Sequence, residues 1–337
     1  TLGIYAPAVG MVLGAALHML IQLPAALSLG FRPSLSFNIR YPGVWEVARL
    51  MPPRALAMGI DQIEQFVAIM LSSLLAAGSL SLFNVARLLY AVPTLLFGAT
   101  IGQAALPSLS AYVAKQDWES FRKTLTNACL QVVFLALPVC VLFIILRIPI
   151  VRLVFGAKTF PWEATLLTGK TMAILMISAV FYAVTQLVIR AYYAMHDTKT
   201  PLIIGLAGAV FNVLFSVLSV KLWGWGILGI AFAISFTAIG EMVVLTTVLA
   251  LKVFPEKRMP MEVWLPLGKM GIIGIVMGFG LWLPMRLLDQ YIFDTTRTLP
   301  LLFLTIITSA IGMTVYLTLS WVFKISQLSS VFGLFRR

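Results

Sequence analysis

Apolar stretches of 20 or more residues recur along the whole length of this 337-residue chain. A helix needs about 20 consecutive apolar residues to cross the hydrocarbon core of a bilayer. Hydrophobic residues make up 61% of the chain and charged residues 11%, whereas a soluble domain has about 45–50% and about 25%, respectively. So little polar surface cannot cover a water-facing globule. The sequence therefore predicts an all-α polytopic membrane protein.

We predict about nine transmembrane helices, one on each of these apolar stretches. Their approximate ranges are 3–27, 52–76, 82–106, 124–146, 165–192, 202–222, 226–251, 265–288 and 299–323. The net charge of the chain is +12. In a soluble protein this excess of basic residues would suggest nucleic acid as a partner, but in a membrane protein it indicates basic cytoplasmic loops and anionic lipid head groups. We expect membrane lipids, and no nucleic acid, as partners.

The distribution of basic residues between the two faces predicts the orientation. Sixteen of the 24 Lys and Arg residues fall on one face of the nine spans and seven on the other, and Arg87 lies within a span. By the positive-inside rule the richer face is cytoplasmic, so we expect a cytoplasmic C-terminus. The chain begins with Thr1 on the opposite face, without an initiator Met or a signal peptide. We therefore expect it to be the C-terminal part of a longer protein.

Polar residues inside membrane spans are costly and usually face a bundle interior or a wet cavity. The second span carries a polar-to-small stripe at helical spacing, formed by Asp61, Glu64, Gln65, Ala68 and Ser72. The third span carries another, formed by Ser81, Asn84, Arg87, Thr94 and Gly98. Two later spans carry a weaker set, formed by Asn212, Ser216, Thr237 and Glu241. These groups are the candidates for a functional site.

Each group also has an ordinary structural explanation. Arg87 lies about five residues from one end of its span, so its side chain could reach the membrane interface by snorkelling. Asp61 and Glu64 could form a hydrogen-bonded cluster between helices, or one of them could take up a proton because neighbouring carboxylates repel each other. Glu241 could simply join two helices. These alternatives remain open at the level of the sequence.

The sequence carries no enzyme signature. His18 and His196 are the only histidines, and neither stands at metal-ligand spacing with cysteines or carboxylates. A G-x-S-x-G nucleophile elbow and a Walker A loop are both absent. We therefore expect no enzymatic activity, no metal centre, no cofactor and no ATP hydrolysis by this chain.

The most informative motif is a twelve-residue segment at the end of the fifth predicted span. It reads Arg190-Ala-Tyr-Tyr-Ala-Met-His-Asp-Thr-Lys-Thr-Pro201 and resembles R-x-F-Y-A-x-x-D-T-K-T-P, a motif of the MviN/MurJ family of lipid II flippases. Other segments fit the same family in the same order, namely 50–53, 78–87, 98–109, 150–156 and 226–233. The resemblance is clear over about residues 1–250, and the last two spans match only in position and hydrophobicity.

The motif has a simple physical reading as the exit from one helix and the entry to the next. Asp197 and Thr198 can cap the following helix, because their side-chain oxygens can accept from its first free N–H groups. Thr200 and Pro201 begin that helix. The two basic residues of the motif are expected at the cytoplasmic interface, and these are Arg190 and Lys199.

The resemblance implies a two-lobe architecture. The complete family protein has fourteen spans around a central cavity, so the nine spans here would be the sixth to the fourteenth. The implied parts are the last helix of the N-terminal lobe, a basic cytoplasmic interlobe loop, the C-terminal lobe, and two final helices that hold the lipid tail and end in a basic cytoplasmic tail. Their ranges are 1–30, 31–51, 52–251 and 252–337.

The resemblance also implies roles for particular residues. Arg87 falls where the family has a cavity arginine that attends the lipid-linked pyrophosphate, and Ser81 matches a cavity serine. Asn84 belongs to the same stripe and joins them as a candidate substrate-binding residue. A guanidinium suits this role because it stays charged and binds phosphate bidentately. At Ala68 and Ser216 this sequence lacks the carboxylates with which some relatives bind sodium.

The predicted function is therefore that of a lipid II flippase working by alternating access. It would move an undecaprenyl-pyrophosphate-linked peptidoglycan precursor from the inner to the outer leaflet of the bacterial cytoplasmic membrane. Energy would come from the membrane potential or from a proton or sodium gradient. The candidate coupling residues are Asp61, Glu64, Asn212 and Glu241.

Three other functions remain in view. One is the export of another lipid-linked oligosaccharide or of a drug, by a related member of the multidrug, oligosaccharidyl-lipid and polysaccharide exporter superfamily. The second, from a different class, is a polytopic membrane enzyme acting on polyprenyl phosphates, and the third is a scaffold that transports nothing. We expect a monomeric transporter, completed by the N-terminal lobe that this chain lacks.

Overall fold

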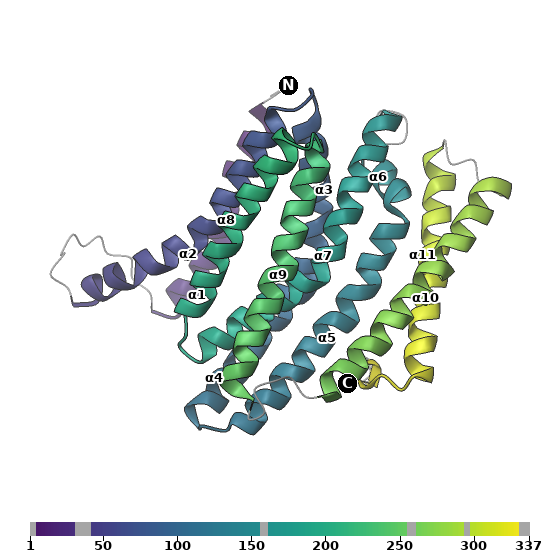
Figure 1. The fold of residues 1–337 in the computed structure, drawn as a ribbon. Helices are drawn as coiled ribbons and strands as arrows, with labels where there is room; N and C mark the ends of the chain where they lie inside the picture. The colour runs from purple at the N-terminus through teal and green to yellow at the C-terminus, as the bar shows by residue number, and fades with distance from the viewer. Residues whose placement is uncertain (1–4, 31–41, 156–160, 255–260, 293–296, 330–337) are drawn as a thin grey trace. The chain divides into compact units, whose positions relative to one another are not determined.

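The computed structural model describes the backbone of residues 5–30, 42–155, 161–254, 261–292 and 297–329. Within these ranges every regular element is a helix (Figure 1). This confirms the all-α fold that the apolar stretches predict. The chain separates into two compact units, residues 1–55 and 56–337, and each is described by itself.

The first unit contains α1 (Ala6–Ser28) and the beginning of α2 (Pro42–Ser73). A proline stands in the first turn of α1, where its missing N–H would have no partner within the helix. The helix ends where the Leu29 N–H donates to the Ala25 carbonyl. The described side chains of α1 are exposed along almost its whole length.

The second unit holds the rest of α2 and all the later helices. These are α3 (Ser79–Pro93), η2 (Thr94–Ala99), α4 (Thr100–Ala114), α5 (Trp118–Ile145), α6 (Arg147–Phe155), α7 (Trp162–Ala194), α8 (Lys199–Lys221), α9 (Gly226–Val253), α10 (Met261–Tyr291) and α11 (Thr298–Val322). Most of them follow the predicted spans to within a few residues.

Eight helical segments in the described part of the chain are long and apolar enough to cross a membrane. They are 8–28, 79–114, 118–145, 162–194, 199–221, 226–253, 263–291 and 298–322. Each coincides with one of the nine predicted spans. The remaining prediction, 52–76, falls on α2, where most side chains before residue 62 lie outside the described residues. The chain is built as a multi-pass membrane protein.

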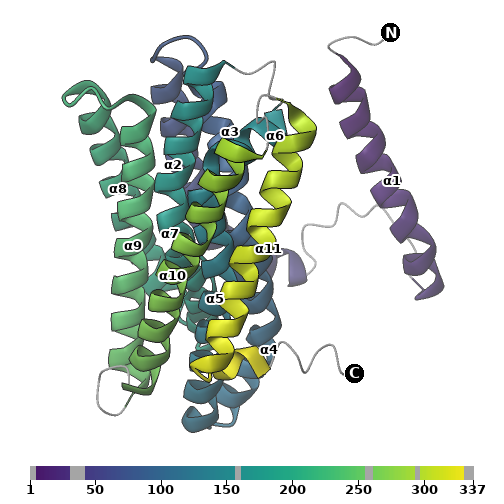
Figure 2. The same ribbon diagram turned by 90° about the vertical axis from the view of Figure 1, so that its right-hand side faces the viewer.

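Helix α7 lies at the centre of the second unit, where it contacts α3, α4, α5, α6 and α9. A continuous series of contacts runs from α8 through α9, α7, α5 and α10 to α11. The hairpin α8–α9 and the hairpin α10–α11 therefore lie on different sides of α7 and α5 (Figures 1 and 2). This arrangement makes α8–α9 a peripheral pair attached mainly through α9.

Three clusters of buried apolar side chains hold these helices together. The largest includes Phe134 and Tyr316 and joins α5, α7, α10 and α11. The second includes Leu187 and joins α4, α5, α7 and α9, and the third includes Phe83 and joins α2, α3 and α9. Burial of such side chains from water stabilises a fold by about 1.5–3 kcal/mol each, but between lipid-facing helices close packing and hydrogen bonds matter more. The Tyr316 hydroxyl supplies one, donating to the Phe134 carbonyl at 2.8 Å.

A π-helical turn, η2, separates α3 from α4 within one continuous helical rod. Pro93 precedes it and has no N–H to donate to the preceding turn. The Thr94 hydroxyl donates to the Ala91 carbonyl at 2.9 Å. Gly98 packs on α7 so closely that a Cβ there would lie 2.7 Å from the Cα of Ala183. Glycine at this position therefore permits the contact between η2 and α7.

Candidate functional site

The polar stripes of α2 and α3 meet at one hydrogen bond. The Arg87 guanidinium on α3 donates to Oε1 of Gln65 on α2 at 3.4 Å. Gly78 forms the turn before α3 with φ +90°, a conformation that glycine adopts without strain. Gln65 is exposed and Arg87 is half-buried. Because a guanidinium has five N–H donors, Arg87 retains donors for a further acceptor such as a phosphate oxygen.

The predicted stripe of the third span divides at η2. Ser81 and Asn84, on the α3 side, are exposed like the accessible part of Arg87. Thr94 is 5% exposed and Gly98 packs against α7. Only the part of the stripe on α3, which precedes η2, is therefore available to a ligand. The predicted substrate-binding residues all belong to this exposed part, and their role stays a prediction.

The stripe on α2 runs from exposed to buried residues. Gln65 is exposed, Glu64 is half-buried, and Ala68 and Ser72 are buried. The Ser72 hydroxyl donates to the Ala68 carbonyl at 2.6 Å, so it is satisfied within its own helix. Asp61 belongs to α2 by its backbone, but its side chain lies outside the described residues. The predicted interplay of Asp61 and Glu64 stays a prediction.

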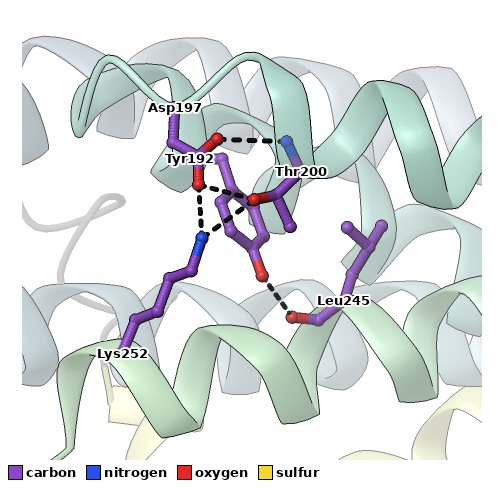
Figure 3. A network of polar contacts seen from close by, with 5 residues as sticks. All are labelled: Tyr192, Asp197, Thr200, Leu245 and Lys252. Atoms are coloured by element: carbon purple, nitrogen blue, oxygen red, sulfur yellow. Dashed lines mark hydrogen bonds and ion pairs between the residues drawn. The ribbon is translucent and has the colours of Figure 1, made fainter.

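The motif segment forms a polar network between the α7–α8 turn and the last turn of α9 (Figure 3). Asp197 accepts two bonds from Thr200, from the N–H at 3.0 Å and from the hydroxyl at 2.7 Å. The Lys252 ammonium donates to Asp197 at 2.5 Å and to the Thr200 hydroxyl oxygen at 2.8 Å. The Tyr192 hydroxyl donates to the Leu245 carbonyl at 2.9 Å. We call Tyr192, Asp197, Thr200 and Lys252 the clasp, because they join α7, α8 and α9.

The clasp keeps Asp197 ionised. Partial burial opposes ionisation of this carboxyl, but hydrogen bonds from Lys252 and Thr200, together with the Lys252 charge, outweigh it and lower its pKa to about 2. The Lys252 ammonium also lies 5.5 Å from the centroid of the Tyr192 ring, a favourable cation–π position. The turn between α7 and α8 is thus held by an ion pair, by two hydrogen bonds from Thr200 to Asp197 and by a cation–π contact.

The other residues of the motif support the same turn in different ways. The Arg190 guanidinium donates to the Gln186 carbonyl at 3.1 Å. Its Cδ packs on α4, where a Cβ at Gly102 would lie 2.8 Å away. The remaining three are Thr198 and Lys199, which are exposed, and Pro201, which is buried. The Asp197 carboxylate accepts the capping bond from the Thr200 N–H as predicted, whereas Thr198 makes no capping bond.

Sequence reasoning missed the other half of the clasp. The sequence identified Lys252 only as a basic residue on the cytoplasmic face, and Tyr192 only as one position of the twelve-residue motif. Lys252 lies 55 residues from Asp197, so no local spacing links them. The only signal was that a basic residue ends one predicted span while an acidic residue follows another on the same face.

Helices α8 and α9 meet along a line of small and polar residues. The Glu241 carboxyl packs directly on Gly208, where a Cβ would overlap it, and Ser219 packs directly on Gly229. These two contacts establish an antiparallel register. Along the same line lie three side chains that we call the polar seam: Asn212, Ser216 and Thr237, which are 2%, 1% and 6% exposed.

The polar seam has unsatisfied hydrogen-bonding groups. The amide nitrogen of Asn212 and the hydroxyls of Ser216 and Thr237 have no hydrogen-bond partner among the described residues. Such groups are rare in folded proteins, and each one invites an explanation. Glu241, one turn from Thr237, is half-buried. The predicted coupling residues Asn212 and Glu241 are thus parts of one line between two helices.

The described part of the chain contains no cluster of three or more His, Cys, Asp or Glu side chains that could hold a metal ion. Its two cysteines, Cys129 and Cys140, are free thiols within the helix α5.

Comparison with known proteins gives a consistent family match. A family model described as "Lipid II flippase MurJ" matches residues 1–303. The "Probable lipid II flippase MurJ" of Bdellovibrio bacteriovorus is 26% identical over 322 residues, which are 96% of this chain and 60% of the relative. The protein of the same description from Thermotoga maritima is 28% identical over 71% of this chain and 48% of its own length. The chain thus spans about 60% or less of these relatives.

Solved structures give the same picture for the fold. The structure titled "Lipid II flippase MurJ, inward closed conformation" aligns with a TM-score of 0.73 and 24% identity, over 95% of this chain and 62% of that one. A transporter of the MOP superfamily from Pyrococcus furiosus aligns with a TM-score of 0.52 and 14% identity, over 84% and 66% of the two chains. At these identities the likeness extends to the fold alone.

Proposed function

We propose a transport function from the premise that this chain belongs to the lipid II flippase MurJ family, whose model matches residues 1–303. The chain would form part of a flippase that moves a lipid-linked peptidoglycan precursor across the bacterial cytoplasmic membrane. The family is one of transporters rather than enzymes. The family match is the observation that carries the proposal, because it extends over most of the chain.

The exposed polar group on α3 supports a role in binding the anionic head of such a precursor. Arg87 would contact the pyrophosphate, and Ser81 and Asn84 would donate further hydrogen bonds. The Gln65 contact supports this role, because among the described residues it engages one of the five guanidinium donors, and the guanidinium has others with which to bind phosphate. An arginine held in this way can bind phosphate bidentately with little loss of side-chain entropy.

The orientation of the transporter is part of the proposal. The excess of basic residues on one face favours a cytoplasmic C-terminus. The precursor would enter a cavity shared with an N-terminal lobe, and the two lobes would rock about it in alternating access. We propose that one copy of the complete protein suffices for transport.

The energy source would act through polar groups within the spans. The membrane potential, protons or sodium are the candidates, and the residues that would respond are Asp61, Glu64, Asn212 and Glu241. Half-burial of Glu64 and burial of Asn212 support this choice, because ionisable and polar groups within membrane spans are costly and usually mark functional sites.

A complementation experiment tests the binding role of Arg87. Cells depleted of their own flippase would express the complete protein with Arg87→Ala, Arg87→Lys, or Lys123→Ala as a matched control. Lys123 is an exposed basic residue in the second turn of α5. We expect no growth with Arg87→Ala, partial growth with Arg87→Lys because the bidentate fork is lost, and full growth with Lys123→Ala. Full growth with Arg87→Ala would refute the binding role.

A further inference from the structure

Two close contacts define the register of α8 against α9. Gly208 lies against Glu241 and Ser219 against Gly229, so a step of four residues along α8 corresponds to a step of about four back along α9. Asn212 and Thr237 each lie four residues from the first contact. They therefore stand opposite each other, one helical turn from the Glu241 carboxyl.

Glu241 lies near the middle of its span. It is fifteen residues from the start of α9 at Gly226 and twelve from its end at Val253, which corresponds to roughly 22 Å and 18 Å. An ionised carboxylate at such a depth is strongly disfavoured, and the neutral acid much less so. Binding of a proton at Glu241 is therefore coupled to how deeply the side chain is enclosed.

The absence of a side chain at Gly208 lets the Glu241 carboxyl approach the backbone of α8. A Cβ at position 208 would overlap the carboxyl, whereas a Cβ at Gly205, one turn away on the same helix, would meet nothing within 4 Å. Gly208 is thus a close-approach glycine and Gly205 is not. The two glycines provide a matched pair for testing whether the position of the carboxyl matters.

Few charged or titratable groups can face Glu241 from the helices around it. Helix α8 has none between Lys199 and Lys221. On α7, Tyr192 binds the Leu245 carbonyl and the Tyr182 ring packs on Tyr90 of α3. Lys252, the single basic residue of α9, is held by Asp197 three turns away. On α2, which packs on α9, Glu64 is half-buried. The side chains of the other charged residues of α2 lie outside the described residues, and these are Glu46, Arg49, Arg54 and Asp61.

We propose that Glu241 and the neighbouring polar seam form a proton-binding site between α8 and α9. The carboxylate accepts a proton from a hydronium ion of the aqueous phase and releases a water molecule, and the resulting neutral carboxyl remains packed on Gly208. The buried hydroxyl of Thr237 and the amide of Asn212 supply hydrogen-bonding groups along which the proton or its carrier water reaches the carboxyl. As the coupling element of transport this site depends on the proposed function, but proton binding itself does not.

Infrared spectroscopy of the complete protein in liposomes tests proton binding directly. A protonated carboxyl has a distinct C=O stretching band that shifts in D2O. Difference spectra between about pH 5 and about pH 9, a range above the usual pKa of an exposed carboxyl, would be recorded for the parent, Glu241→Gln and the control Glu119→Gln. Glu119 is exposed in the first turn of α5. We expect Glu241→Gln to remove one titrating band that Glu119→Gln retains.

The glycine pair then tests the geometry. Gly208→Ala should shift the frequency or the titration midpoint of the Glu241 band, because the carboxyl must move, while Gly205→Ala should leave both unchanged. A Glu241→Gln spectrum identical to that of the parent would overturn the proposal. So would a band that responds to sodium at constant pH rather than to pH.

Transport is measured separately, so that the two proposals can fail independently. If the parent shows the Glu241 band but transports no lipid-linked precursor, the proposed function is wrong and the proton site stands. If the parent transports and the band is missing, the proton site is wrong and the proposed function stands.

Discussion

The clasp and the polar seam join α8 to α9 at different points of the same hairpin, and they do so in opposite ways. In the clasp, Asp197, Thr200 and Lys252 bond to one another at distances of 2.5–3.0 Å. In the seam, buried groups of Asn212, Ser216 and Thr237 have no hydrogen-bond partner among the described residues. The first arrangement stabilises the folded chain, and the second lowers its stability. Polar groups between helices therefore differ in effect: satisfied groups hold the helices together, whereas unsatisfied buried groups cost stability and call for an explanation.

The largest expected effect comes from removing the acid of the clasp. Asp197→Ala takes away the cap of α8 and the acceptor of the Lys252 ammonium, so we expect a loss of about 2 kcal/mol of unfolding free energy. Thermal unfolding of the complete protein in detergent measures it. Thr198→Ala is the matched control, since this exposed neighbour forms no capping bond. Equal losses from the two variants would contradict the account of the clasp.

The seam should respond with the opposite sign. Asn212→Leu replaces an amide whose buried nitrogen has no partner among the described residues by an apolar side chain of similar size, so we expect a gain of about 1 kcal/mol in unfolding free energy. Ser235→Ala is the contrasting control, because the Ser235 hydroxyl on α9 donates to the Ile174 carbonyl of α7 at 3.0 Å. Its loss should destabilise by about 1 kcal/mol. Destabilisation by Asn212→Leu would mean that the amide is satisfied in the native protein.

A smaller effect is expected at the basic end of the clasp. Lys252 is 43% exposed, so water screens its attraction to Asp197. We expect Lys252→Met to destabilise by about 0.5 kcal/mol. A double-mutant cycle with Asp197→Ala should give a coupling of similar size. A coupling energy of zero would mean that the Lys252–Asp197 pair adds nothing to stability beyond the cap that Asp197 provides for α8.

The smallest effect expected is the response of the clasp to pH near neutrality. Because the folded-state pKa of Asp197 is lowered to about 2, its contribution is fully present above the unfolded pKa of about 3.9 and is lost as pH falls towards 2. The stability difference between the parent and Asp197→Asn should therefore stay constant from about pH 5 to about pH 8. A difference that changes within this range would show that Asp197 is not held ionised as described.

The sequence predicted what local patterns determine. A run of about 20 apolar residues is a local property, so the span predicted at 226–251 appears as α9 (Gly226–Val253). The cap by Asp197 was also predictable, because it acts on a residue three positions away. Both features were predictable because each depends on residues that lie close together in the sequence.

What the sequence could not predict depends on contacts between distant segments. The pairing of Lys252 with Asp197 requires the α8–α9 hairpin to close, which no spacing reveals. The contact of Glu241 with Gly208 depends likewise on the register of two helices. The division of the α3 stripe at η2 was missed because a regular helical spacing was assumed through Pro93, where the hydrogen-bond pattern changes.

The π-helical turn η2 has a consequence for how the site around Arg87 is encoded. An α-helix turns by about 100° per residue, and a π turn takes in an extra residue that rotates the two flanking helices relative to each other. If residues 94–99 instead formed a regular α-helix of the same length, Arg87 would be swung by about 100° relative to α4. The direction of this guanidinium therefore depends on the helical geometry of a segment two turns away from it. Loss of the π turn at unchanged length would reorient the site without altering any residue in it.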